Sequence, residues 1–147
     1  MADFLLQISS NKRARQVVQT LGLPLPMPER LERAPEAWSE RPLHDRPVVV
    51  GSGPAPELTA ELARALTAAG ADPWVVGGAD TLAAWRAAGE GWGRPPHDAN
   101  AAGPERPWAL VLDASGAASP EDLRALYDFF QPRVRSIARS GRLVVLG

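Results

Sequence analysis

Residues 47–56 read PVVVGSGPAP, and this stretch decides the fold. A short run of valines that ends on glycine is typical of a strand buried on both faces of a parallel sheet. After the turn, apolar residues recur at helical spacing from Pro56 to Ala69, and Gly70 follows as a helix-ending residue. A buried strand, a tight turn and a helix together indicate the first half of a βαβ unit.

The same alternation continues along the rest of the chain. A short helix is predicted from Asp80 to Ala88, and a last helix from a Ser119 cap to its end at Ser140-Gly141, with a kink at Pro132. Residues 90–107 are rich in Gly, Pro and Asn and are expected to form a loop. Three more apolar runs are predicted strands, over residues 73–77, 108–113 and 142–147.

Four apolar strands alternating with three helices imply parallel pairing with right-handed crossovers. For residues 47–147 we therefore expect an α/β domain, a doubly wound parallel sheet of about four strands that is Rossmann-like or flavodoxin-like. Residues 1–46 are expected to form an N-terminal arm, in which a helix from a Ser9–Asn11 cap to Leu21 precedes a proline-rich stretch. Trp38 is expected to pack on the main body, with a partner-binding anchor as the alternative.

Composition excludes several classes of function. The chain has 147 residues and a net charge of -1, so there is no basic field for nucleic acid or for an anionic membrane. It has no cysteine, which excludes disulfides, thiolate metal sites and a cysteine nucleophile. There is neither a secretory signal nor an apolar run of roughly 20 residues that could span a bilayer. We therefore expect a cytoplasmic protein.

The turn after the first strand resembles a dinucleotide fingerprint only in part. Gly51 and Gly53 match the first two glycines of Gly-x-Gly-x-x-Gly, but Pro56 stands at the third position. Pro54 and Pro56 each lack the N–H group that would bind a pyrophosphate. The favoured interpretation is a tight turn that binds no phosphate, and nucleotide binding at Gly51 and Gly53 is the alternative.

Asp113 and Ser115 are the best-placed polar pair, because Asp113 ends the third predicted strand and ligands bind at the carboxyl ends of such strands. The alternative is a routine Asx hydrogen bond in the turn. Asp80 is placed at the start of the next helix rather than at a ribose. His44 and His97 fall in predicted loops and are interpreted as solvated, with no metal site, and the five tryptophans are assigned to core packing.

The final third carries a resemblance. It reads LVLDASG from residue 110, LYDFFQP from residue 126 and RSGRLVVLG from residue 139, and LGLP at residues 21–24 is similar as well. This resembles the N-terminal domain of the high-molecular-weight 3-oxoacyl-ACP reductases of the short-chain dehydrogenase/reductase family. In that family the N-terminal domain is flavodoxin-like and is not thought to hold FMN. An NAD(P)H-dependent domain follows it and reduces 3-oxoacyl thioesters.

The resemblance brings no catalytic residue with it. The family's Tyr-x-x-x-Lys cannot be placed, because Tyr127 is followed four residues later by Gln131, and the only lysine is Lys12. Whether this chain is itself an enzyme therefore stays open. The leading hypothesis is a non-catalytic N-terminal domain or fragment with an assembly role, whose partners are the reductase domain and further copies of the chain.

The predicted strand over residues 142–147 supports the fragment interpretation. Leu143 to Leu146 would lack the segments that normally cover such a strand, and an exposed apolar edge invites pairing with another chain. The chain is thus expected to be truncated there and to be oligomeric or unstable. The alternative is a free-standing α/β domain that binds a nucleotide or another anion. A flavodoxin-type electron carrier is disfavoured, since its phosphate turn would be rich in Ser and Thr.

Overall fold

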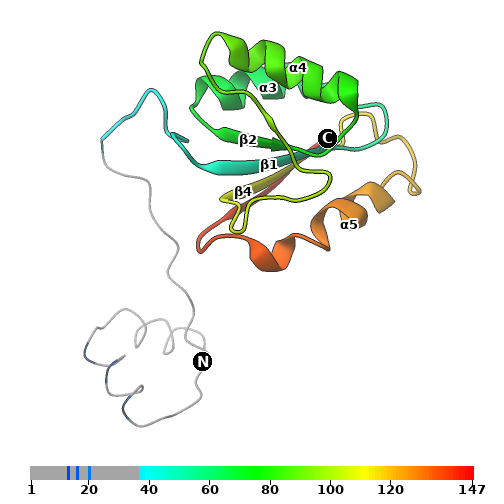
Figure 1. Ribbon diagram of the computed structural model, residues 1–147. Coiled ribbons are helices and arrows are strands. Elements are labelled where there is room, and N and C mark those ends of the chain that lie inside the picture. Colours follow the sequence, from blue (N-terminus) through cyan, green and yellow to red (C-terminus); the bar gives the residue numbers. More distant parts are fainter. Residues whose placement is uncertain (1–12, 14–15, 17–19, 21–36) are drawn as a thin grey trace. The chain divides into compact units, whose positions relative to one another are not determined.

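The computed structural model describes residues 13, 16, 20 and 37–147 (Figure 1). The chain divides into two compact units, Met1–Arg33 and Ala34–Gly147, and each is considered by itself. The second unit is an α/β domain with a five-stranded sheet and three α-helices. Its elements in chain order are β1 (Pro47–Ser52), α3 (Thr59–Ala68), β2 (Asp72–Val75), α4 (Ala79–Glu90), β3 (His97–Asp98), β4 (Ala109–Asp113), α5 (Arg124–Phe130), a 3₁₀ turn (Val134–Ser136) and β5 (Arg142–Leu146).

All strand pairs are parallel, and the sheet order is β3-β2-β1-β4-β5. In the central pair, all of β4 and residues 48–51 of β1 are buried. Apolar residues face each other along the pair, since Val48 lies against Ala109 in register and Val50 against Val111. The continuous valine and leucine runs of β1 and β4 thus mark strands that are covered on both faces.

Two layers of helix cover the sheet, as Figure 1 shows. On one face Val48 and Val50 pack with Ala63 of α3 and Trp85 of α4. On the other face Val49, Leu110 and Leu112 pack with Phe129 of α5. The alternation of neighbouring valines between the two clusters follows from the two-residue period of a strand.

The short strand β3 decides the topology. Without it, the remaining strands would have the order 2-1-3-4 of a flavodoxin-like sheet. Because β3 pairs with the outer side of β2, and because α4 packs beside α3 on the same face, the chain runs from β1 through β2 to β3 in one direction. The order 3-2-1-4-5 is that of the Rossmann arrangement, so the two arrangements left open by the sequence are distinguished.

Two predictions of elements were wrong. The sequence placed residues 90–107 in a loop, whereas residues 97–98 form β3. The last helix was expected from a Ser119 cap to Ser140-Gly141 with a kink at Pro132, but α5 covers only Arg124–Phe130. Turns with i to i+3 hydrogen bonds precede it, and the chain leaves the helix at Pro132, whose ring cannot continue the α-helical ladder.

The tryptophans divide between the core and the surface. Trp85 is buried, with 1% of its surface exposed, as core packing predicts. The prediction was wrong for Trp38, which is 84% exposed, and for Trp92, which is 49% exposed. Trp38 stands before Arg41, where the contacts of this segment with the domain begin, so nothing in the described part of the chain covers it.

The expected arm boundary at residue 46 falls inside the second unit. Leu43 N donates to Ala69 O at 2.9 Å, and Asp45 N donates to Gly70 O at 3.1 Å. These two bonds attach the segment before β1 to the end of α3. The predicted N-terminal helix and the proline-rich stretch up to residue 36 lie outside the described residues, apart from Arg13, Gln16 and Thr20, which are helical.

Candidate functional site

The candidate site lies at the topological switch point of the sheet, between the carboxyl ends of the neighbouring strands β1 and β4. The segment after β1 leads to α3 on one face, and the segment after β4 leads to α5 on the other. Ligands of doubly wound sheets bind in the crevice that such diverging segments leave open. The structure brings three of the four residues proposed from the sequence to this point, namely Gly53, Asp113 and Ser115.

Asp113 is completely buried, and both of its carboxylate oxygens accept hydrogen bonds. Oδ2 accepts from Leu58 N at 3.0 Å and from Thr59 Oγ1 at 3.4 Å. Oδ1 accepts from Ser115 N at 3.2 Å and from Ser115 Oγ at 2.5 Å. Asp113 therefore makes the Asx hydrogen bond considered from the sequence, and it also reaches 55 residues back to the start of α3.

Ser115 completes this cap on α3. Its Oγ accepts a hydrogen bond from Glu57 N at 2.9 Å. The N–H groups of Glu57 and Leu58, which point from the start of α3 toward the switch point, are thus engaged by a hydroxyl and a carboxylate of the chain itself. In a dinucleotide-binding fold the same helix end carries the pyrophosphate.

The two segments are also in direct contact. Gly53 N donates to Asp113 O at 2.7 Å. A Cβ atom at Gly116 would lie 1.9 Å from Ala55 O, so only a glycine permits this approach. Ala55 has a φ of 45°, which is unusual for a residue with a side chain. The turn after β1 is thus folded onto the turn after β4.

Gly51 has a different environment from the other three candidates. It lies inside β1, and a Cβ atom there would lie 2.5 Å from the Phe129 ring. Its missing side chain therefore makes room for the aromatic residue that attaches α5 to the sheet. Asp80 lies in the first turn of α4, so the sequence placed it correctly at the start of that helix.

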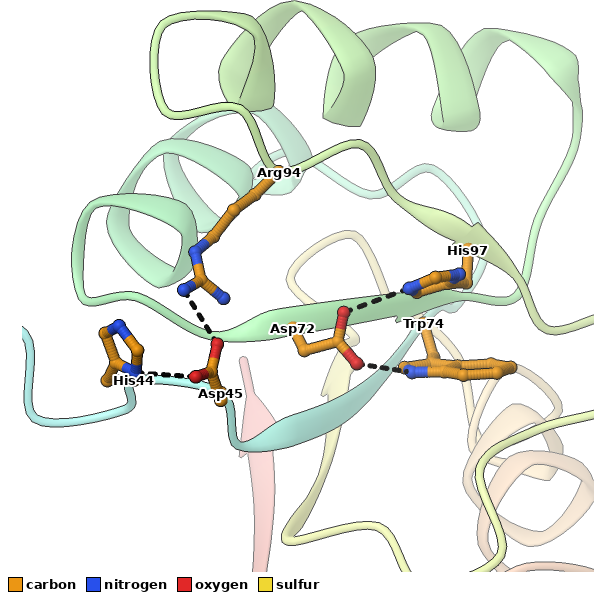
Figure 2. A network of polar contacts seen from close by, with 6 residues as sticks. All are labelled: His44, Asp45, Asp72, Trp74, Arg94 and His97. Atoms are coloured by element: carbon orange, nitrogen blue, oxygen red, sulfur yellow. Dashed lines mark hydrogen bonds and ion pairs between the residues drawn. The ribbon is translucent and has the colours of Figure 1, made fainter.

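The histidines lie in two separate polar networks, which Figure 2 shows. His97 is in β3 rather than in a loop, and its ring stacks on Trp74 with the centroids 4.5 Å apart. His97 Nε2 lies 3.0 Å from Asp72 Oδ1, and Trp74 Nε1 donates to Asp72 Oδ2 at 3.0 Å. His97 is exposed, as the sequence predicted, but the prediction that it lies in a loop was wrong, because it belongs to the edge strand β3.

His44 is exposed and pairs with its neighbour Asp45, the Nδ1–Oδ2 distance being 2.8 Å. Asp45 Oδ1 accepts a hydrogen bond from Arg94 at 2.8 Å, and this bond lowers the pKa of the Asp45 carboxyl. The network joins the segment before β1 to the segment after α4 (Figure 2). Among the residues that the structure describes, no three potential metal ligands come together.

Sequence reasoning missed Asn100 and Arg133. Asn100 Oδ1 accepts from Gly77 N at 3.1 Å, and its Nδ2 donates to Gly77 O at 2.8 Å, so one amide side chain joins the ends of β2 and β3. Arg133 donates to Phe129 O at 2.8 Å, and burial lowers the pKa of its guanidinium. Both residues line a pocket of about 320 Å³ on the α5 face of the sheet.

Comparison of the sequence with models of protein families and with curated proteins gave no match. Within the described ranges, no helix combines the length and the hydropathy needed to cross a bilayer. The geometry of the domain therefore carries the functional argument.

Proposed function

We propose that this chain is the non-catalytic N-terminal domain, or a fragment, of a 3-oxoacyl-ACP reductase of the short-chain dehydrogenase/reductase family. Its role is assembly: it packs on the reductase domain that follows it in the parent enzyme and places its neighbour in a dimer. The NAD(P)H cofactor and the chemistry of thioester reduction belong to that second domain. The resemblance of residues 108–147 to the family is the sequence support for this proposal.

One observation carries the non-catalytic part of the proposal. Just before α3, at the helix end where a Rossmann domain binds pyrophosphate, the N–H groups of Glu57 and Leu58 are engaged by Ser115 and Asp113. A phosphate would have to take these donors from the buried Asp113 carboxylate, which accepts four hydrogen bonds. That would leave a buried negative charge without partners and beside a second negative charge, at a cost of several kcal/mol. Pro54 and Pro56 supply no alternative N–H donors in this turn.

The position of the only tyrosine agrees with this proposal. Tyr127 lies on α5 with 66% of its surface exposed, and Gln131 follows it where the reductase family has lysine. Most of the Tyr127 side chain is thus in solvent, on a helix of the α5 face. No proton relay of the family's type can be assembled from it.

Calorimetric titration of the chain with NADPH and with NADH tests the proposal. We expect no binding heat for either nucleotide, from protein whose folding is verified by circular dichroism. Micromolar binding of either one would overturn the non-catalytic assignment. The coding sequence after Gly147 gives a second test: Thr-Gly-x-x-x-Gly-x-Gly followed by Tyr-x-x-x-Lys supports the reductase parent, and a stop codon contradicts it.

A free-standing anion-binding domain is the second candidate, and the pocket beside Arg133 favours it. Residues 99–104 and the turn after α5 line this pocket, and Ser136 adds a hydroxyl. An arginine has five N–H donors, and one guanidinium nitrogen of Arg133 donates to Phe129 O. Other N–H donors of the same guanidinium remain for an anion. Nucleotide binding that is lost in R133Q but kept in S115A would establish this second function in place of the first.

A further inference from the structure

The pocket beside Arg133 lies where the chain crosses from β3 to β4 without forming a helix (Figure 1). Residues 99–104 line one side of this pocket of about 320 Å³, and Pro132, Arg133 and Ser136, which follow α5, line another. Val49 lines it as well, so the hollow reaches the middle of the central strand β1. Helices normally cover both faces of a parallel sheet, and here an irregular segment leaves part of one face open to a ligand.

Both sides of the pocket are held by backbone hydrogen bonds. Ala99 N donates to Val75 O at 2.9 Å, so the crossing segment starts attached to β2. Ala138 N donates to Pro107 O at 2.8 Å, and this bond joins the segment after α5 to the end of the crossing segment. The fold itself therefore forms the pocket, as is usual for sites that bind small molecules.

Arg133 gives the pocket a positive charge that nothing in the pocket neutralises. Asn100, Arg133 and Ser136 are its polar lining residues, and neither Asp nor Glu is among the residues that line it. The Asn100 amide is engaged by Gly77, and Ser136 Oγ donates to Arg133 O at 2.8 Å. In the part of the chain that the structure describes, no carboxylate pairs with Arg133. A partly buried charge without a partner is unfavourable, and an anion would relieve it.

The guanidinium of Arg133 is fixed on one side and free on the other. Nη1 donates to Phe129 O at 2.8 Å, and the guanidinium carbon lies 5.1 Å from the centroid of the Phe129 ring. Nε and Nη2 form no hydrogen bond with the described residues, and neither nitrogen is sealed from solvent. These two nitrogens form the edge of a guanidinium that binds a carboxylate through two parallel hydrogen bonds.

The rest of the pocket is suited to an apolar group. Apart from the three polar residues and Gly103, its lining consists of Val49, Ala99, Ala101, Ala102, Pro104, Pro107 and Pro132. Its volume of about 320 Å³ is at the lower end of the range for small-molecule sites, so it suits a ligand the size of a single ring rather than a dinucleotide. A single guanidinium matches a single negative charge, which a carboxylate carries.

We propose that this pocket binds a small monocarboxylate with an apolar body, whose carboxylate is held by Nε and Nη2 of Arg133. The site goes beyond the assembly role proposed above and does not depend on it, because residues of this domain alone form the pocket. It also specifies an anion that the second candidate function leaves open. The turn before α3, which Asp113 and Ser115 cap, takes no part, so the nucleotide titration and the test of this site can fail separately.

A carboxylate could also come from an Asp or Glu side chain of a neighbouring polypeptide. The apolar lining favours a small molecule, because such a side chain brings only one or two methylene groups and would leave the part of the pocket near Val49 unfilled. Acetate presents a carboxylate with almost no apolar body and therefore represents this second source in the experiment.

Nuclear magnetic resonance titration of the full chain, labelled with ¹⁵N, tests the proposal. We expect benzoate to shift the amide signals of residues 99–103 and 133–136 and the Nε–H signal of Arg133, and to saturate them with a Kd on the order of 1 mM, as befits so small a ligand. Benzamide has the same shape without the charge. Benzamide, acetate and inorganic phosphate should each bind at least about tenfold more weakly, a difference of one guanidinium–carboxylate contact or of the apolar burial.

Two variants examine the role of the guanidinium. R133K keeps the positive charge and the apolar stem but removes the planar fork, so it should weaken benzoate binding by roughly tenfold or more. R135Q is the matched control, since Arg135 is exposed two residues further on and does not line the pocket, and it should bind benzoate as the native chain does.

The absence of saturable shifts at these residues in the native chain would overturn the proposal, as would unchanged benzoate binding in a folded R133K. Equal binding of benzamide would mean that the charge is not read, and equal binding of phosphate that the site is not selective for a carboxylate. Equal binding of acetate would point to the side chain of a neighbouring polypeptide instead. The ligand series needs only the native chain, so it decides the proposal even where R133K does not fold.

Discussion

At the scale of single residues, Asp113 connects the two halves of the sheet. Its carboxylate is the point at which the end of β4 and the start of α3 are joined, through Leu58 N and Thr59 Oγ1. The side chain is completely buried, so in the folded domain these donors bond to the carboxylate and not to bulk water. Asp113, which stands where doubly wound sheets bind their ligands, thus has a structural role in this domain.

The D113A variant should therefore be strongly destabilised. It leaves Leu58 N and the Ser115 groups without their acceptor, and hydrogen bonds to a charged group contribute about 1.5–3 kcal/mol each, so we expect a loss of about 3 kcal/mol or more. Urea denaturation measures it. D80A is the matched control, because Asp80 is an exposed acidic residue in the first turn of α4, and it should cost less than about 1 kcal/mol. Equal losses in the two variants would contradict the proposed role of Asp113.

Asp122 makes the stability of the turn before α5 depend on pH. Hydrogen bonds from Ala118 N, and from the hydroxyl and the N–H of Ser119, lower the pKa of the Asp122 carboxyl. A group whose pKa is lower in the folded state stabilises the protein above its unfolded pKa, which is about 3.9 for aspartate. This contribution is lost as the pH falls through the lowered folded pKa.

D122N should therefore be less stable than the native chain at neutral pH, and the difference should shrink in acid as Asp122 becomes protonated. Urea unfolding of both proteins, at neutral pH and at several acidic values, measures the difference directly. D128N is the control, since Asp128 is exposed on α5 and pairs only with Arg124, at 3.5 Å. A gap between native and D122N that stays constant with pH would contradict the assignment.

At the scale of elements, the local sequence pattern predicted the strands that are buried on both faces, and it missed the strand that depends on tertiary contacts. The runs around Val49 and Leu110 were recognised because a continuous apolar strand stands out in any sequence. β3 was missed because the strand is only two residues long and because both of its residues, His97 and Asp98, are polar and exposed. What makes them a strand is the backbone pairing with Trp74 and Val75, which no local pattern contains.

The candidate site divides in the same way. The position of Asp113 at a strand end could be predicted, since it follows directly from the strand before it. Its partners could not, because Leu58 is 55 residues away in the sequence and only the βαβ crossover brings it close. Gly51 matched a fingerprint by spacing, yet its environment is the Phe129 ring, a contact that depends on where α5 packs.

At the scale of the whole molecule, the domain begins before its first strand. Residues 41–46 pack on the body through three backbone hydrogen bonds: Leu43 N to Ala69 O, Asp45 N to Gly70 O, and Asp72 N to Arg46 O. The Arg41 guanidinium also lies over the Trp92 ring, 5.0 Å from its centroid. A division at residue 46, which composition suggests, would cut through these contacts.

Two shortened chains test where the domain starts. A chain beginning at Glu40 keeps the contacts of residues 41–46, and a chain beginning at Pro47 loses them. The three backbone hydrogen bonds, at about 1 kcal/mol each, predict that the shorter chain is less stable by roughly 3 kcal/mol in urea denaturation. Both chains lack the same N-terminal residues up to 39, so the comparison isolates the segment itself. Equal stabilities would place the start of the domain at β1. In that case the hydrogen bond from Asp45 N to Gly70 O, in the turn that Gly70 forms with a φ of 90°, would not contribute to stability.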